Sequence, residues 1–167
     1  DPSKNKTKVE RKLIKRRAIF VCNALEDVTR IERGISSDSP AASKKVFEMA
    51  YALRSAGEKA VILSMGRGKP KRRISFYKAK TVRMRGVLVV YVPFSDIPFI
   101  SQLLSLISMP YFLYLLSSSS EKNYAVFYNR SSAYITSLFM SVILGIERIL
   151  ELEDAENIFT GNWSPHQ

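Results

Sequence analysis

The sequence holds a single cysteine and a single histidine, and this scarcity restricts the chemistry that its side chains can support. Cys22 has no second cysteine for an internal disulfide, and the apolar run around it predicts a buried thiol. His166 is the second-last residue, so the chain offers neither a histidine-based catalytic triad nor a multi-histidine metal site. The lone thiol fits a reducing, cytosolic setting.

Acidic residues are scarce where the positive charge is concentrated. The net charge is +11, and residues 67–85 carry nine Lys or Arg side chains and no acid. Residues 1–17 carry eight more against two acids, so the two stretches hold 17 of the 26 basic residues. Such clusters attract phosphate, either in nucleic acid or on an anionic membrane surface. Residues 147–156 are strongly acidic by contrast, so charge is polarised along the chain.

No signal-peptide pattern follows the first two residues, which are Asp-Pro and not Met. We expect the chain to be an excerpt of a longer protein. Its 167 residues, 46% of them hydrophobic and 25% charged, are enough for one ordinary globular domain with a core. We divide the chain into a basic N-terminal arm, residues 1–17, and one domain, residues 18–167.

Short continuous apolar runs predict strands that are buried on both faces of a sheet. They comprise residues 18–24, 60–65, 87–92, 124–128 and 148–152. One helix is expected to begin at Ser39 as N-cap and Pro40 as first helical residue and to stop at Gly57, and residues 132–144 predict another.

Strands that alternate with helices indicate βαβ units. The expected fold is α/β, with an open, doubly wound, mainly parallel sheet and helices on both faces. Its binding crevice should lie at the carboxyl ends of the strands. Residues 25–38 are expected to form a polar loop, and the basic stretch 67–85, with short β-prone pieces, is expected to run over the surface.

Residues 97–120 contain no charged side chain and are long enough to be a transmembrane candidate. Pro98 and Pro110 interrupt the segment, and a span would put the flanking strands on opposite sides of a bilayer. Three interpretations stay open: a buried or partly buried crossover helix, an interfacial membrane-docking helix, and a true span. Aromatic residues and the nearby basic stretch favour the interfacial position. Residues 131–146 are also uncharged and predict a core helix.

Three loops are expected to meet at the crevice. The first begins with Glu26 and Asp27 and contains Gly34. It leads to a helix start whose N–H groups can hold an anion. Gly34 can permit close approach of a ligand there, or it can equally shape a turn. The second contains Asn129 and Arg130, which can bind a sugar or a phosphate or simply enter the next helix.

The third loop carries carboxylates at the end of the fifth predicted strand. These are Glu151, Glu153 and Asp154. Alternation places Glu151 and Glu153 on one face of the strand and Asp154 on the other. A carboxylate in an otherwise buried strand is costly unless it is paired, so a role in binding sugar hydroxyls or in deprotonating an acceptor alcohol is favoured.

Several of these segments, in this order, resemble glycosyltransferase family 4. They are Ser-Pro-Ala-Ala-Ser-Lys-Lys-Val-Phe-Glu-Met-Ala-Tyr-Ala-Leu-Arg-Ser-Ala-Gly-Glu-Lys-Ala-Val-Ile-Leu-Ser at 39–64, Tyr-Val-Pro-Phe at 91–94, Tyr-Asn-Arg at 128–130 and Leu-Glu-Leu-Glu-Asp at 150–154. The similarity covers residues 18–155. The sequence departs from many relatives in having only Gly34 where they have a Gly-Gly pair, and Glu153 where they have a histidine.

The resemblance implies a GT-B enzyme with two Rossmann-like halves that transfers a sugar from a nucleotide-sugar donor with retention of configuration and without a metal or other cofactor. This chain would be the N-terminal half, which shapes the acceptor site, with Glu153 in the catalytic role. The half that binds most of the donor is not in these residues, so we expect the 167-residue chain alone to be inactive.

Family members that act on lipid-linked acceptors dock to membranes through this half, which implies a cytoplasmic, peripheral membrane location. The expected contacts are Arg67, Lys69, Lys71, Arg72, Arg73, Phe99, Tyr111 and Phe112. Alternative functions are a basic module that binds nucleic acid or an anionic membrane without catalysis, and a structural membrane protein. No helix-turn-helix, RNA-recognition or zinc pattern supports nucleic-acid binding.

Overall fold

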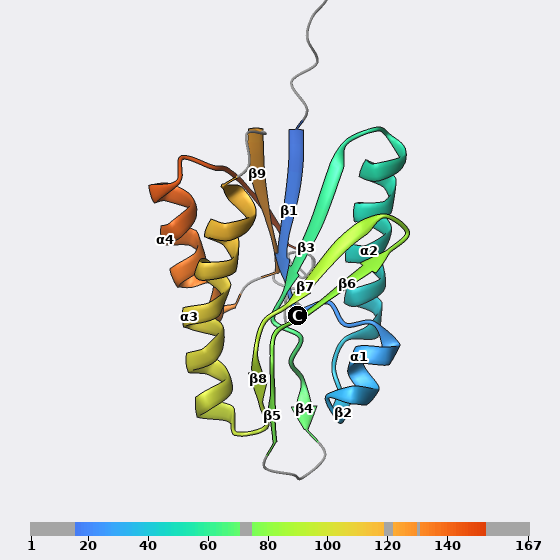
Figure 1. The fold of residues 1–167 in the computed structure, drawn as a ribbon, viewed down its shortest axis with the longest axis vertical. Coiled ribbons are helices and arrows are strands. Elements are labelled where there is room, and N and C mark those ends of the chain that lie inside the picture. The colour runs from blue at the N-terminus through green and yellow to red at the C-terminus, as the bar shows by residue number, and fades with distance from the viewer. Residues whose placement is uncertain (1–15, 71–74, 119–121, 130, 153–167) are drawn as a thin grey trace, which may run out of the picture.

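A computed structural model describes residues 16–70, 75–118, 122–129 and 131–152. Its centre is a six-stranded sheet in the order β10-β9-β1-β3-β7-β6 (Figure 1). The first five strands in that order are parallel, and the last lies antiparallel at the edge. In chain order the strands are β1 (Arg16–Cys22), β3 (Lys59–Ser64), β6 (Lys80–Met84), β7 (Val87–Tyr91), β9 (Lys122–Tyr128) and β10 (Glu147–Glu151).

Helices cover both faces of the sheet (Figure 1). One face carries α1 (Asp27–Glu32) and α2 (Pro40–Ser55), and the other carries α3 (Pro98–Ser117), the short 3-10 helix η1 (Ser132–Tyr134) and α4 (Ile135–Ile143). The predicted α/β class, the mainly parallel sheet and the helices on both faces are confirmed. The fold is Rossmann-like, because β1 is central and successive strands are added on both sides of it.

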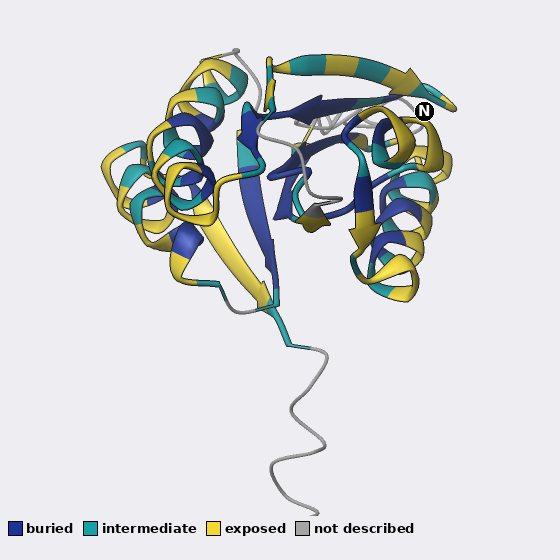
Figure 2. Cartoon of the chain, turned by 90° about the horizontal axis from the view of Figure 1, so that it is seen from below, coloured by how far each residue is buried: buried dark blue, intermediate teal, exposed yellow. Residues whose placement is uncertain are grey.

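Each face of the sheet has its own hydrophobic core, as the alternation of side chains along a strand requires. Ala18, Phe20 and Cys22 of β1 pack toward α2, whereas Ile19 and Val21 belong to the core under α3. Figure 2 shows the central strands in the colour of buried residues. Burial raises the pKa of the Cys22 thiol to about 12, so the prediction of a buried thiol is confirmed.

The fifth predicted strand is not buried, which corrects an expectation from its sequence. β10 lies at the sheet edge, and four of its five residues are exposed. Ile149 and Leu150 are among these exposed side chains. Glu151, the described carboxylate at its end, is half-buried at this edge and not enclosed in the sheet, so the burial cost of a carboxylate inside a buried strand does not apply to it.

Two predicted irregular segments contain regular structure. Residues 25–38, expected as a loop, form α1 and the short strand β2 (Ile35–Ser37). The basic stretch contributes β6 to the main sheet and β4 (Lys69–Pro70), which pairs with β2; β5 (Phe76–Tyr77) pairs with β8 (Phe94–Ser95). These segments have too few apolar residues for their pairing to be recognised locally, because neighbouring strands decide it.

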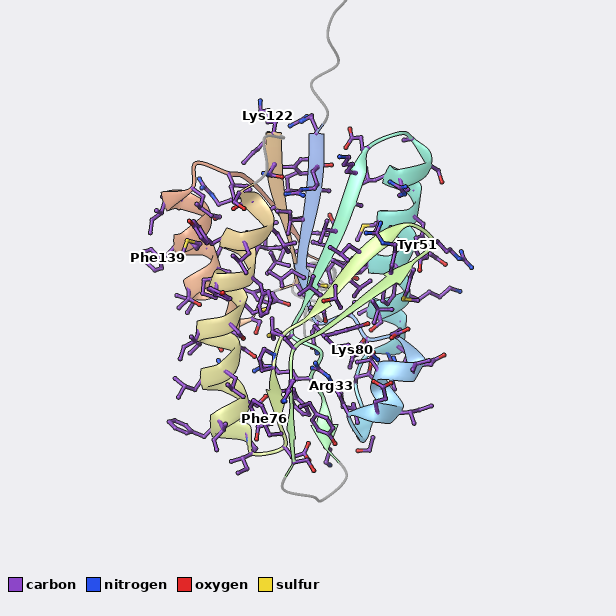
Figure 3. All side chains as sticks on the ribbon, viewed as in Figure 1. Arg33, Tyr51, Phe76, Lys80, Lys122 and Phe139 are labelled. Carbon is purple, nitrogen blue, oxygen red and sulfur yellow. The ribbon has the colours of Figure 1, made fainter. Side chains whose placement is uncertain are left out.

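Arg33 connects the end of α1 to the loops that follow β3 and β7, and sequence reasoning did not single it out. The side chain is 2% exposed and donates to the carbonyl oxygens of Gly66 at 2.8 Å and Val92 at 2.9 Å. Burial lowers its pKa to about 10. A Cβ at Gly66, where φ is +55°, would lie 2.6 Å from the Arg33 guanidinium, so a glycine is needed there. Arg33 is labelled in Figure 3.

The long apolar segment forms the crossover helix α3 between β7 and β9, with one face on the sheet. Neither proline interrupts it: Pro98 is in the first turn, where it is tolerated, and Pro110 lies inside the helix. Pro110 has no N–H to give to the Leu106 carbonyl, which instead accepts from Thr136 Oγ1 of α4 at 2.6 Å. α3 is therefore a partly buried crossover helix, and contact of its outer face with a membrane stays a prediction.

Candidate functional site

A pocket lies at the point where the direction of strand addition reverses. After β1 the chain adds β3 and β7 on one side, and then α3 carries it back to β9 on the other side. The connections that leave the adjacent carboxyl ends of β1 and β9 therefore lead to helices on opposite faces of the sheet, and this is where open α/β sheets bind ligands. The pocket has a volume of about 270 Å³. We call it the switch-point pocket; its lining residues are Asn23, Ala24, Ser39, Ala42, Ser43, Val46, Met65, Arg67, Tyr128, Asn129, Ser131 and Tyr134.

The chain that leaves β1 is held by side chains on neighbouring elements. Ser43 Oγ of α2 accepts from the Leu25 N–H at 3.0 Å. Ser64 Oγ donates to the Ala24 carbonyl at 2.6 Å and accepts from the Gly66 N–H at 3.0 Å. These buried hydroxyls satisfy backbone groups that a strand end would otherwise leave unpaired, so this wall of the pocket is rigid.

The opposite wall comes from the end of β9. Asn129 adopts a positive φ of 63°, a conformation that asparagine tolerates better than most residues, and its N–H donates to the Glu151 carbonyl at 2.8 Å. Ser131 caps η1 by accepting from the Ala133 N–H at 3.3 Å. Burial raises the pKa of the Tyr134 phenol, so it remains a neutral group at ordinary pH.

Among the described residues, the lining offers hydroxyls, amides and one guanidinium, and none of these residues is a carboxylate or a histidine. Such a set can hydrogen-bond a polar ligand and attract a negative charge, whereas it contains no general base for abstracting a proton. Within the described residues, no three His, Cys, Asp or Glu side chains gather closely enough to hold a metal ion.

Of the predicted acceptor-binding residues, the structure places Asn129 in the pocket. Glu151 lies outside the lining, and its carboxylate is 3.7 Å from the Lys45 ammonium of α2. Glu26 accepts from the Thr29 hydroxyl at 2.7 Å, and Asp27 is exposed and paired with Arg30.

Gly34 does not line the pocket either. It follows α1 with a φ of +59°, so the alternative that it shapes a turn describes its position. Arg130, Glu153 and Asp154, together with Lys71, Arg72 and Arg73, lie outside the described residues. The catalytic assignment of Glu153 therefore stays a prediction.

The predicted membrane contacts divide into two groups. Phe99 and Tyr111 are exposed on α3, and Lys69 is exposed on β4. Phe112, by contrast, packs against the core under α3, and Arg67 is half-buried in the switch-point pocket. The helix period turns Phe112 and the loop after β3 turns Arg67 partly inward, and the membrane contact of these two residues stays a prediction.

The outer faces of α3 and α4 are apolar, while their inner faces carry serines. Ser101, Ser105 and Ser108 of α3 and Ser137 and Ser141 of α4 are buried. On the solvent side, Phe99, Phe139 and Ile143 are 79%, 67% and 77% exposed. In Figure 3, Phe139 projects from α4 away from the sheet. We call this surface the α3–α4 apolar face; its large exposed side chains are Phe99, Ile100, Leu103, Ile107, Tyr111, Tyr114, Leu115, Ile135, Leu138, Phe139, Val142 and Ile143.

Small residues between helices let their backbones approach, and apolar residues outside suit a surrounding of lipid. α3 is also long and apolar enough to cross a membrane, by length and composition alone. In the chain, however, α3 connects strands of one sheet, and it packs on one face of that sheet. It therefore lies on the domain surface.

Sequence reasoning placed the helix start at Ser39 by the crevice, but it missed Asn23, Ser43 and Tyr134 as pocket residues and gave Arg67 another role. Asn23 and Arg67 each follow a buried strand closely, and that position was the available signal. Comparisons of the chain with protein-family models, with curated proteins and with solved structures find no match.

Proposed function

We propose that this domain is the acceptor-side half of a retaining GT-B glycosyltransferase that uses a nucleotide-sugar donor. The observation that carries the proposal is the switch-point pocket, which lies at the carboxyl ends of β1 and β9 and is lined by hydroxyl and amide groups suited to a sugar. The resemblance to glycosyltransferase family 4 in the sequence supports the same assignment. The pocket binds the acceptor, and the catalytic groups for transfer come from residues outside its lining.

The test is sugar transfer by the full-length gene product, with a panel of labelled nucleotide sugars and with lipid and saccharide acceptors. Asn129→Gly removes the pocket amide but keeps a residue that accepts positive φ. We expect this variant to lower kcat/KM about tenfold, the effect of losing one hydrogen bond of about 1.4 kcal/mol in the transition state. The matched control is Ser36→Ala, an exposed residue on β2 that does not line the pocket.

The isolated 167-residue chain is expected to give no turnover with any of these donors. Turnover by this chain alone would contradict the assignment to one half of a two-domain enzyme. Failure of the full-length product to transfer sugar from every donor would reject the enzymatic proposal altogether.

The same domain is proposed to contact an anionic membrane surface through the α3–α4 apolar face, at the cytoplasmic side. Apolar side chains that lie in the headgroup region favour binding by burial of their area, and basic residues add attraction to anionic lipid. Nucleic-acid binding accounts for the positive charge of the chain, but it leaves this uncharged face without a role.

Vesicle sedimentation tests the membrane contact, with phosphatidylcholine vesicles compared with vesicles that also contain phosphatidylglycerol. The triple variant Phe99→Ser, Ile107→Ser, Phe139→Ser is expected to lower partitioning more than tenfold, because several buried side chains of about 1.5 kcal/mol or more are lost. The control is Ile31→Ser, equally exposed but on α1 over the opposite face of the sheet. Equal partitioning of the triple variant and the control would reject this surface, and binding to a random oligonucleotide in preference to the vesicles would favour the nucleic-acid alternative.

A further inference from the structure

Arg67 lies between two pockets at the carboxyl edge of the sheet. It lines the switch-point pocket on one side and, on the other, a second pocket of about 470 Å³ that reaches the start of α3. Of the residues that the structure describes, Asn23 is the only other one that lines both pockets. A group bound at Arg67 is therefore bound where β1, β3 and α3 meet.

The position of Arg67 is set by hydrogen bonds at both its backbone and its side chain. Asn23 Nδ2 donates to the Arg67 carbonyl at 2.7 Å, and the Arg67 N–H donates to Asn23 Oδ1 at 2.9 Å. Arg67 Nη1 donates to Gln102 Oε1 of α3 at 2.7 Å, and Gln102 Nε2 donates to Ser132 Oγ at 3.2 Å. The guanidinium is thereby preorganised before any ligand arrives.

Arg67 differs from Arg30 and Arg33 in how its positive charge is compensated. Arg30 pairs with Asp38 at 2.9 Å, and Arg33 donates to several backbone carbonyls. Arg67 has one amide partner, and none of the carboxylates in the part of the chain that the structure describes forms an ion pair with it. Burial lowers the pKa of Arg67, which reflects the cost of a cation that is partly removed from water.

The surroundings of Arg67 favour the switch-point pocket over the second pocket as the position for an anion. Among the described residues, Arg67 is the only charged residue that lines the switch-point pocket, whereas the second pocket also contains Lys69 and Asp96, and the Asp96 carboxylate has a buried Oδ1 atom with no hydrogen-bond partner among those residues. Asp96 would repel an anion on its own side. The first turn of α2 also faces the switch-point pocket through Ser39, Ala42 and Ser43, contains no acid, and adds the positive end of a helix dipole.

We propose that Arg67 binds an oxyanion, a phosphate or a carboxylate, carried by the acceptor that enters the switch-point pocket. The acceptor part of this statement rests on the proposed function; the anion site itself does not. A planar guanidinium with N–H groups beyond the one given to Gln102 binds such an oxyanion with two parallel hydrogen bonds.

Isothermal titration and NMR of the 167-residue chain test this site with glucose 1-phosphate, glucuronate, neutral glucose and UDP. We expect the two anionic sugars to bind at least about tenfold more tightly than glucose. Arg67→Gln should lower their affinity about tenfold or more and leave that for glucose unchanged, and Arg67→Lys should retain part of it. Arg83→Gln, an exposed position on β6, is the matched control, and the amide spectrum of each variant shows whether its fold is intact.

Equal binding of glucose and glucose 1-phosphate by the parent chain would overturn the proposal, as would unchanged anion affinity in a folded Arg67→Gln variant. UDP binding that depends on Arg67, without such dependence for the anionic sugars, would overturn the assignment to the acceptor. Arg67-dependent anion binding in a protein that transfers no sugar would reject the enzymatic proposal and keep the anion site. Transfer to a neutral acceptor that is unaffected by Arg67→Gln would keep the enzymatic proposal and reject the anion site.

Discussion

At the scale of single residues, buried hydroxyls decide how firmly the pocket and the helix layer are held. Ser64 makes two hydrogen bonds at the end of β3, to the Ala24 carbonyl and from the Gly66 N–H. Ser137 in α4 is equally buried, but its hydroxyl has no hydrogen-bond partner among the described residues. The same side chain therefore has opposite energetic consequences at the two positions.

These two serines form a matched pair of substitutions. Ser64→Ala should lower the free energy of unfolding by about 2 kcal/mol, because two buried backbone groups lose their partner. Ser137→Ala should leave it unchanged or raise it by about 1 kcal/mol, because a buried, unpaired hydroxyl is removed. Urea unfolding followed by circular dichroism measures both. A larger loss for Ser137→Ala than for Ser64→Ala would show that the hydroxyl of Ser137 is satisfied.

At the scale of elements, a proline in α3 explains how α4 is attached to it. Pro110 frees the Leu106 carbonyl, and Thr136 of α4 occupies that acceptor. The feature that looked like a helix breaker in the sequence thus provides a bond between two helices. The bond also helps to hold α4 against α3, and the two helices together present the α3–α4 apolar face.

A double-mutant cycle tests this attachment. Thr136→Val should destabilise the protein by about 1–2 kcal/mol, because the Leu106 carbonyl loses its donor. In a Pro110→Ala background the cost should be smaller, since the backbone N–H that the substitution restores can bond to the same carbonyl. Additive effects of the two substitutions on the free energy of unfolding would exclude the compensation.

At the scale of the whole molecule, several buried acids make the fold sensitive to alkali. Burial raises the pKa of the Cys22 thiol and of the Tyr91, Tyr124 and Tyr134 phenols. Above the ordinary pKa values of about 8.5 for cysteine and about 10 for tyrosine, the unfolded chain releases protons that the folded chain keeps, so stability falls as pH rises. The lowered pKa values of Arg33 and Arg67 act in the opposite direction at alkaline pH, but they are two groups against four.

Tyr134→Phe isolates one contribution to this alkaline loss. Above pH 10 the free energy of unfolding should fall less steeply in the variant than in the parent protein, and the two slopes should differ by about 1.4 kcal/mol per pH unit. The reason is that one buried phenol no longer holds a proton that the unfolded state releases. Tyr111→Phe, at an exposed position, should follow the parent protein. Urea titrations at pH 8, 10 and 11 provide the slopes, and identical slopes for the parent and Tyr134→Phe would contradict the assignment.

The sequence by itself determined the α/β class, the existence of the five parallel strands and their succession along the chain, and the helices that follow from apolar periodicity and from Pro40 and Gly57. These features depend on local patterns, in which each residue reports on its own strand or helix. Asn129 was also recognisable, because a polar residue directly after a buried strand lies at the carboxyl edge of the sheet.

Only the tertiary structure decided which of these residues meet. Strand order brings the carboxyl ends of β1 and β9 side by side, and hydrogen bonds join Asn23, Arg67 and Gln102, which are distant in the sequence. The sheet edge left β10 exposed, and packing turned Phe112 and Arg67 inward while Phe99 stayed outside. Pairing between strands and the facing of a helix depend on neighbours far along the chain, so no local pattern of residues contains them.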